Sequence, residues 1–282
     1  MDNLIVSTVK RLLRWDGKQN NMVERDNAFG LTWDEDHIYF SWNPLHRNFS
    51  VIDKFNKNFE FEETILDQEQ WNIHEIYSWG DLYITATQKG GVAKLNKETH
   101  SFTLKQPPGH QHVNSIFAYK DVLHFHSSNG VPKGHPTGCE VFRYDKNFDY
   151  IDQIKIQEGG HIFHSLFIED DILYACCHQN YLQVRSNLYV FDMNTMKGRM
   201  IEVREDTTNG FLRGIACNKD YFFIGESQQE SIRSQRLMGN SRVLVVDKNN
   251  FKLVDTIELE DTGQIRCVRL ETGDLAHNGI DF

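Results

Sequence analysis

Apolar and polar residues alternate along most of the chain, in short runs that turn residues separate. The runs are rich in β-branched and aromatic residues, as in ITAT (84–87) and YFFIGES (221–227), which is typical of strands. Pairs such as Gly80-Asp81 and Lys120-Asp121 stand between successive runs and suit the tight turn of a β-hairpin. No segment keeps a helical apolar period over several turns, so the pattern predicts an all-β chain.

The predicted strands form a repeating unit of four. A hairpin with an Asp-containing turn is followed by a third strand that ends in Asp, Asn or Lys, as in RVLVVDKN (242–249), and then by a fourth. The unit recurs every 35–50 residues, roughly, which is the period of a β-propeller of four-stranded antiparallel blades. The hairpins that open the units lie at 29–42, 72–87, 113–127, 163–177 and 212–227.

The two ends of the chain supply one further unit. Residues 5–18 resemble a second and a third strand without a first, whereas QIRCVRL (264–270) resembles a first strand without its successors. Joined, they form one blade that closes the ring and hides its sheet edges. We therefore expect a single six-bladed propeller domain over residues 1–282. Five or seven blades are the alternatives, because terminal blades are the easiest to miscount.

The whole chain resembles the β-propeller superfamily, and within it the short-blade propellers of the NHL and YVTN type. The Gly-His and Trp-Asp signature of WD repeats is absent, as is a regularly spaced kelch double glycine. FGLTWDEDHIYFSW (29–42) resembles the opening of glutamine cyclotransferase propellers, and RGIACNKDYFFIGES (213–227) resembles a segment of uncharacterised bacterial propellers. The resemblance implies a fold and no particular activity.

Composition excludes several classes of function. The net charge of −10 argues against a general nucleic-acid binder. No apolar run approaches the length of about 18 residues that a membrane-spanning helix needs. The five cysteines include no C-x-x-C pair, so we expect core thiols, a reducing compartment and a cytoplasmic protein. Neither the phosphate-binding motif G-x-x-x-x-G-K-[ST] nor G-x-G-x-x-G after a strand occurs, so no nucleotide cofactor is expected.

One position of the repeat is polar where packing would favour a small apolar residue. It lies seven residues before the turn Asp, near the start of each first strand, which in a propeller lines the central channel. We call this set the column. Its members are Phe29, His74, Asn114, His164 and Arg213, with Arg266 added from the last strand if its turn is one residue longer.

Loops on the same predicted face gather further basic and imidazole groups, so an anionic small molecule is the expected ligand. Three second-to-third loops are long: 127–138, 178–187 and 227–240. The basic and His residues on or near this face, besides the column, are His46, Arg47, His110, His112, His126, His135, His161, His178, Arg185, Arg233, Arg236 and Arg242.

Two kinds of chemistry fit these residues, each with a structural alternative. His74 and His164 could hold a divalent ion (Zn, Mn, Fe or Cu), with further ligands from His112, His126, His178 or Glu226; alternatively these histidines hydrogen-bond between blades. His164 or His178 with Glu226 could move a proton while Arg213 and Arg266 hold an anion. Alternatively each arginine pairs with a carboxylate, for which Glu75, Glu260 and Asp261 are candidates.

The leading hypothesis is a lyase or hydrolase that acts on an anionic substrate at the channel mouth, with or without a metal ion. Its expected catalytic residues are His164, His178 and Glu226, and its metal ligands are His74 and His164. Its expected ligand-binding residues are His74, Asn114, His126, Arg213 and Arg266. The alternative is a non-catalytic ligand-binding or protein-interaction scaffold that docks a partner on loops 127–138 and 227–240. Neither hypothesis includes a nucleic-acid or membrane partner.

Overall fold

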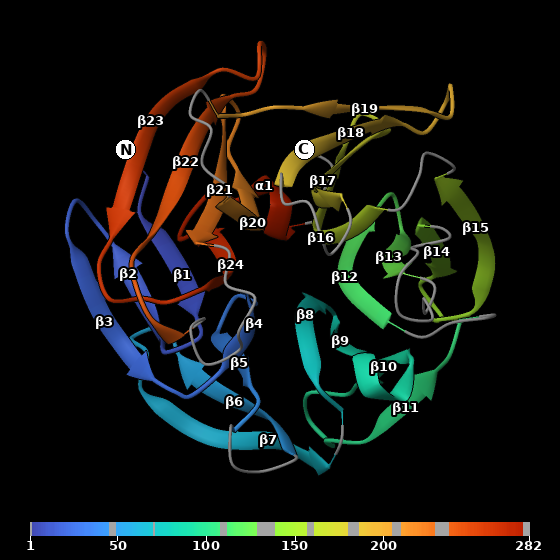
Figure 1. Cartoon of the computed structure of the whole chain (residues 1–282). Coiled ribbons are helices and arrows are strands. Elements are labelled where there is room, and N and C mark those ends of the chain that lie inside the picture. Colours follow the sequence, from blue (N-terminus) through green and yellow to red (C-terminus); the bar gives the residue numbers. More distant parts are fainter. Residues whose placement is uncertain are drawn as a thin grey trace.

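The computed structural model describes residues 2–44, 49–69, 71–107, 112–128, 139–156, 161–179, 186–204, 210–228 and 237–278. Within these ranges, six four-stranded antiparallel sheets stand around a central axis like the blades of a propeller (Figure 1). The predicted all-β, six-bladed architecture is confirmed. No helix among the described residues has the length and apolar character needed to cross a membrane.

Five blades follow one another along the chain, each running from the axis outward. Blade 1 comprises β4 (Ala28–Trp33), β5 (His37–Trp42), β6 (Phe49–Asn56) and β7 (Phe61–Glu69). Blade 2 comprises β8 (Ile73–Trp79), β9 (Asp81–Ala86), β10 (Gly91–Leu95) and β11 (Phe102–Lys105), with the 3-10 turn η1 (Thr87–Lys89) before β10. Blade 3 comprises β12 (His112–Tyr119), β13 (Val122–Ser128), β14 (Cys139–Asp145) and β15 (Tyr150–Ile156). Blade 4 comprises β16 (His161–Glu169), β17 (Ile172–Gln179), β18 (Ser186–Asp192) and β19 (Lys197–Ile201). Blade 5 comprises β20 (Gly210–Cys217), β21 (Tyr221–Gln228), β22 (Ser241–Asp247) and β23 (Leu253–Leu259).

Both termini build blade 6, as the sequence predicts. It comprises β24 (Ile265–Leu270), β1 (Leu4–Thr8), β2 (Arg11–Trp15) and β3 (Gln19–Glu24). The carboxyl-terminal β24 is innermost and pairs antiparallel with β1, where Leu4 lies opposite Leu270. An ion pair of 2.7 Å between Arg14 and Glu271 also joins the two ends of the chain.

Aromatic side chains fill the space between neighbouring blades. Tyr77, Phe117, Phe167 and Phe222 come from blades 2, 3, 4 and 5 and form a continuous edge-to-face series. Their successive ring centroids are 5.7, 5.5 and 6.2 Å apart. Rings in this geometry stabilise a core beyond the area that they bury. Each blade is therefore held by its neighbours as well as by its own hydrogen bonds.

The outer hairpins repeat one turn geometry, which explains the polar end of each third strand. The side-chain oxygens of Asn56, Asn96, Asp145, Asp192 and Asp247 each accept a hydrogen bond from the backbone N–H two residues on. Asn and Asp favour such turns because their side chains replace a backbone acceptor. The polar residue at the end of these third strands thus recurs in the sequence because each of the five turns needs the same side-chain acceptor.

The segment after β24 packs near the axis. The single helical turn α1 (Leu275–Asn278) lies against β16 and β20, close to the centre of the ring (Figure 1). Asp274 is buried and accepts hydrogen bonds from the backbone N–H groups of Leu270, Cys217 and Ala276. The carboxyl end thereby ties blade 6 to blade 5.

Candidate functional site

All six innermost strands are irregular at the position of the column. The pairing of each with its neighbour skips at least one residue, and the skipped residues are Phe29 and Gly30, His74 and Glu75, Asn114, Ser165, Arg213 and Gly214, and Arg266. Such bulges break the strict alternation of a strand and redirect its side chains. Five of the six column residues are thus bulge residues, and the sixth, His164, directly precedes Ser165.

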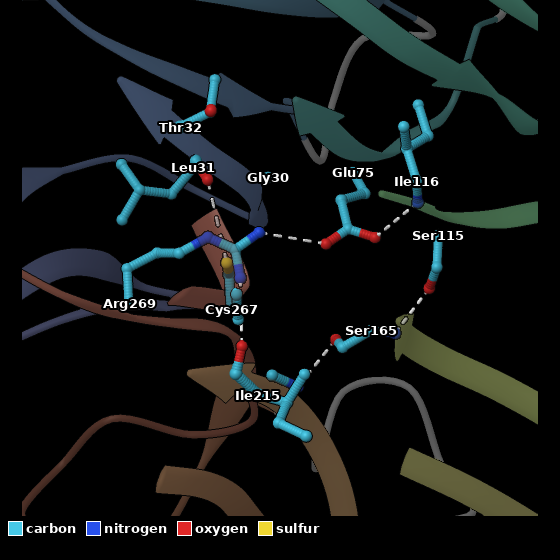
Figure 2. A network of polar contacts seen from close by, with 12 residues as sticks. Gly30, Leu31, Thr32, Glu75, Ser115, Ile116, Ser165, Ile215, Cys267 and Arg269 are labelled. Atoms are coloured by element: carbon cyan, nitrogen blue, oxygen red, sulfur yellow. Dashed lines mark hydrogen bonds and ion pairs between the residues drawn. The ribbon is translucent and has the colours of Figure 1, made fainter. Parts of the chain in front are cut away.

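Short hydroxyl side chains satisfy backbone groups that the bulges release. The amide of Gly30 donates to Ser41 Oγ and that of Glu75 to Thr85 Oγ1, both at 2.8 Å. Between blades, Ser165 donates its amide to Ser115 Oγ, and its own Oγ accepts from the Gly214 amide at 3.0 Å (Figure 2). Because buried backbone donors need acceptors, these hydroxyls hold the bulges in place.

Four blades bring column residues together around Phe29. The His74 ring is stacked on the Phe29 ring, with centroids 5.2 Å apart. The guanidinium carbons of Arg213 and Arg266 lie 5.5 and 4.5 Å from the centroid of the same ring. Both arginines are largely buried, 4% and 8% exposed. With the neighbouring His112 and Asn114, these residues form what we call the axial cluster.

Hydrogen bonds orient the imidazole and amide groups of the axial cluster. His74 Nδ1 lies 2.9 Å from Asn114 Oδ1, and Asn72 Nδ2 lies 3.4 Å from His74 Nε2. This arrangement assigns the ring proton of His74 to Nδ1, since a carbonyl oxygen can only accept. The His112 ring stands edge-on to His74, with centroids 5.1 Å apart.

The side-chain amide of Asn114 has one donor group, Nδ2, that is not satisfied within the described residues. It is 2% exposed, and its Nδ2 has no hydrogen-bond partner among the described residues. Its Oδ1 faces His74, so Nδ2 is the group left to meet something else. A buried N–H without an acceptor costs about 1–3 kcal/mol, so the position favours an acceptor.

Both imidazoles of the axial cluster are neutral at physiological pH. Burial lowers the pKa of His74 well below its ordinary value, and the charges of Arg213 and Arg266 add to the effect, as does His112. Burial, followed by the charge of Arg213, lowers the pKa of His112 to about 4. The positive charge of the cluster therefore resides on the two guanidinium groups.

A buried ion pair ties the strands together beside the axial cluster. Arg269 Nη2 lies 3.2 Å from Glu75 Oε1, and the other Glu75 oxygen accepts from the Ile116 amide (Figure 2). Arg269 also donates to the Ile215 carbonyl at 3.1 Å. Glu75, a candidate partner for Arg213 in the sequence, thus pairs with Arg269. Sequence reasoning missed Arg269, although a charged residue inside the apolar run QIRCVRL is a visible signal.

Glu226 lies between two arginines. Arg204 Nη1 is 2.7 Å from Glu226 Oε1, and Arg242 Nε contacts the other carboxylate oxygen. Glu226 is 3% exposed, and a Cβ at Gly210 would lie only 2.0 Å from its Oε1. The geometry is that of a structural ion-pair network, and the catalytic role of Glu226 stays a prediction. Sequence reasoning did not identify Arg204.

The remaining histidines of the predicted site either contact other aromatic rings or lie outside the described residues. The His164 ring centroid is 5.7 Å from that of Phe211. His126 is fully buried, with its ring 5.1 Å from Phe163, and burial lowers its pKa to about 3. The side chains of His161 and His178 lie outside the described residues, as do His46, Arg47, His110, His135, Arg185, Arg233 and Arg236.

A metal ion finds little support in the described part of the chain. No three His, Cys, Asp or Glu side chains gather there in an arrangement that could hold one. His74 is directed to Asn114 and lies in the field of two guanidinium groups, which disfavours a second cation. The pairing of His74 and His164 as metal ligands therefore stays a prediction.

Comparison with known proteins agrees on the fold. No protein-family model matches the chain, and no curated protein matches it. Among solved structures, a chain of a nidogen/laminin complex superposes with a TM-score of 0.71 at 10% identity, covering 96% of this chain and 98% of that one. TolB from Acinetobacter baumannii gives a TM-score of 0.66 at 12% identity, over 95% and 66% of the two chains. A protein of unknown function from Bacteroides caccae gives 0.66 at 11% identity, over 95% and 98%.

These identities are too low to transfer a function, and the three matches show the fold alone. Their superpositions extend over at least 95% of this chain, so they support the overall arrangement described above. The chain has the fold of a six-bladed β-propeller.

Proposed function

We propose that this propeller binds a small anion at the axial cluster, through a carboxylate, sulfate or phosphate group. The observation that carries the proposal is the buried Asn114 Nδ2, which lacks an acceptor among the described residues. It belongs to a cluster in which the field of Arg213 reaches both His74 and His112. An anion would accept from the amide and the guanidinium groups together, and such charge-assisted hydrogen bonds are the strongest available to a protein.

Two buried carboxylates, Glu75 and Glu226, are engaged by arginines that lie outside the axial cluster. Glu75 pairs with Arg269, and Glu226 lies between Arg204 and Arg242. A chain with a net charge of −10 thus places two buried guanidinium groups beside neutral imidazoles at its axis. Such a site attracts an anion in spite of the overall charge.

Lyase or hydrolase chemistry on the bound anion would require a proton-transfer group beside it. His164 and His178 remain the candidates for that role, and a divalent ion on His74 and His164 remains the metal-dependent version. The ion-paired state of Glu226 makes binding, rather than catalysis, the function that the geometry supports best.

A protein-docking scaffold is the second candidate. One structural neighbour is part of a nidogen/laminin complex and covers 96% of this chain. In addition, the outer strands β7, β11, β15 and β23 each expose a large apolar side chain, namely Phe61, Phe102, Tyr150 and Val254. Exposed apolar groups of this size are typical of interaction surfaces when they are contiguous. Docking at the outer strands would not depend on the axial cluster. The loops 127–138 and 227–240, which the sequence predicts as the docking surface, lie mostly outside the described residues, so docking on them stays a prediction.

Calorimetric titration with sulfate, phosphate, acetate, succinate and citrate tests the proposal. We expect at least one anion to bind, and Arg213→Met and Arg266→Met each to weaken binding by about tenfold or more. Arg143→Met is the matched control, because Arg143 pairs with Asp152 on the outer strands of blade 3. Thermal unfolding of each variant checks that it is folded. Absence of binding by every anion, or an equal loss in the Arg143 variant, would overturn the proposal.

A further inference from the structure

We propose that the segment after β24, residues 272–278, is a strap that opens and closes the end of the axis opposite the axial cluster, with Asp274 as its latch. In the closed state the strap covers the carboxyl ends of the innermost strands. In the open state it moves away about Thr272 and Gly273, while the six blades stay together. This conformational device does not depend on the proposed anion binding.

The strap and the axial cluster lie at opposite ends of the innermost strands. Asp274 accepts hydrogen bonds from the amides of Cys217 and Leu270, the last residues of β20 and β24. Arg213 and Arg266 lie four positions earlier on these two strands, a distance of about 13 Å along extended chain. Because α1 also lies close to the centre of the ring (Figure 1), the strap covers one end of the axis.

The carboxylate of Asp274 joins three parts of the chain. Its Oδ2 accepts from the Leu270 amide at 3.0 Å, and its Oδ1 accepts from the amides of Cys217 and Ala276 at 3.2 and 3.0 Å. The residue is 1% exposed. Loss of the carboxylate removes the acceptor of three buried N–H groups at once, which disfavours the closed state. Asp274 therefore acts as the latch.

The rest of the strap is short. Its helix α1 has a single turn, and a helix of that length is not stable without packing. Leu275 and Ala276 supply the packing against the core. Before them, Thr272 and Gly273 are exposed, and a Cβ at Gly273 would meet nothing within 4 Å. Short segments with few buried groups open locally at a lower cost than the whole fold, so the strap can open by itself.

Opening of the strap leaves the ring closed. Within blade 6, β1 pairs with β24 ahead of the strap. Glu271, the residue before the strap, pairs with Arg14 at 2.7 Å, and Arg269 pairs with Glu75 at the axis. Each of these contacts is made by residues outside 272–278, so the blades keep their arrangement when the strap opens.

A buried charge weakens the closed state. Burial raises the pKa of Asp274 to about 6, and this effect exceeds the opposing effects of Arg269 and of the three amides. At neutral pH the closed strap therefore holds a buried negative charge, which water would stabilise in the open strap. Opening removes that cost.

Cys217 reports on the strap because its thiol lies under it. The residue is fully buried. Burial raises the pKa of its thiol well above the ordinary value, the charge of Asp274 adds to this effect, and the Ala276 amide opposes it. We expect iodoacetamide, followed by peptide mass spectrometry, to label Cys217 at least about tenfold faster in Asp274→Ala than in the wild type. Truncation after Glu271 should accelerate the labelling at least as much.

Two controls separate opening of the strap from loss of structure. Asp192→Ala is the matched variant, because Asp192 accepts from two backbone amides in an outer turn of blade 4, and it should leave the labelling of Cys217 unchanged. Cys139 and Cys177 are buried in blades 3 and 4 and should keep their slow labelling in every variant. Equal acceleration of all three thiols would mean that the ring itself opens. Unchanged labelling of Cys217 in the truncated protein would mean that the strap does not cover it, and either result would overturn the proposal.

Hydrogen exchange of the wild type tests the strap without any substitution. We expect the Ala276 amide to exchange through a local opening that low concentrations of denaturant do not accelerate. In contrast, the amides of β1 that pair with β24 should exchange by global unfolding, which denaturant accelerates steeply. The same steep dependence on denaturant at both places would overturn the proposal.

Discussion

Buried polar residues near the axis differ in whether the protein itself satisfies them. Glu75 and Arg269 meet each other, and Glu75 also accepts a backbone N–H. In contrast, neither Asn114 Nδ2 nor either ring nitrogen of His126 meets the geometry of a hydrogen bond within the described residues. Because an unmet buried polar atom lowers stability, such positions persist where a ligand or another requirement maintains them.

His126 allows a direct test at this scale through the pH dependence of stability. Burial lowers its pKa to about 3 in the folded protein, against 6.5 when exposed. Between these values the unfolded chain binds a proton that the folded chain does not. The free energy of unfolding therefore falls as pH decreases from about 6.5 to about 3, by on the order of 4 kcal/mol from this residue alone.

Replacing His126→Phe should remove that contribution to the slope. We expect urea unfolding at neutral and acidic pH to show a variant that gains stability relative to wild type as pH falls. Phe125→Leu, a packing change in the same strand, should instead lower stability by a similar amount at every pH. Parallel pH profiles for wild type and His126→Phe would contradict the predicted burial of an uncharged ring.

At the scale of elements, the bulges require close approach between neighbouring innermost strands. A Cβ added at Gly30 would lie 2.6 Å from the backbone nitrogen of Ile76 in the next blade, and one at Gly214 would lie 2.6 Å from that of Val268. Backbone atoms cannot move aside as a flexible side chain can. These glycines therefore determine how closely blades 1 and 2, and blades 5 and 6, approach at the axis.

Gly30→Ala tests the contribution of this approach. We expect a loss of about 2–3 kcal/mol in the free energy of unfolding, because the methyl group has to push β4 and β8 apart. Gly80→Ala is the comparison: its Cβ would meet nothing within 4 Å, and only its φ of +70° is unfavourable, at about 1 kcal/mol. Chemical denaturation of both variants gives the values. A loss at Gly30 no larger than that at Gly80 would show that β4 and β8 can move apart at little cost, and that close approach does not limit Gly30.

The constant length of the inner hairpins explains why the column can be predicted from the sequence. The hairpin between each pair of inner strands places its turn Asp seven residues after the column position, in all five consecutive blades. In blade 6 no hairpin joins β24 to β1, yet Arg266 still occupies the bulge. The repeated turn Asp alone thus predicts the column members Phe29, His74, Asn114, His164 and Arg213, whereas Arg266 joins them only if its turn is one residue longer.

The partners of these residues could not be predicted in the same way. Glu75 and Arg269 are 194 positions apart, and their contact follows from ring closure rather than from any local pattern. Asp261, considered as a partner for Arg266, pairs with Lys10 and Arg11, which depends on how β2 lies beside the end of β23. Residue spacing within a blade is readable from sequence, whereas distances between blades require the closed ring.

At the scale of the whole molecule, two sets of contacts hold the ring closed, one within blade 6 and one at the axis. Within blade 6, β1 pairs with β24 and joins the two ends of the chain. At the axis, Arg269 of blade 6 reaches Glu75 of blade 2 and the Ile215 carbonyl of blade 5. Blade 1 lies between blades 6 and 2, so this ion pair links blades that are not direct neighbours.

Breaking the ion pair between Glu75 and Arg269 should therefore lower the free energy of unfolding more than breaking an exposed ion pair does. Arg269→Met leaves Glu75 buried without its counter-charge, and we expect a loss of about 3–5 kcal/mol. Adding Glu75→Gln removes the stranded charge and keeps an acceptor for the Ile116 amide, so the double variant should regain part of that loss. Arg143→Met, which breaks the partly exposed pair with Asp152, should cost no more than about 1 kcal/mol. A double-mutant cycle by urea unfolding measures the coupling. Strictly additive effects of Glu75→Gln and Arg269→Met would show that the two residues stabilise their blades independently, and that closure rests on the β1–β24 pairing.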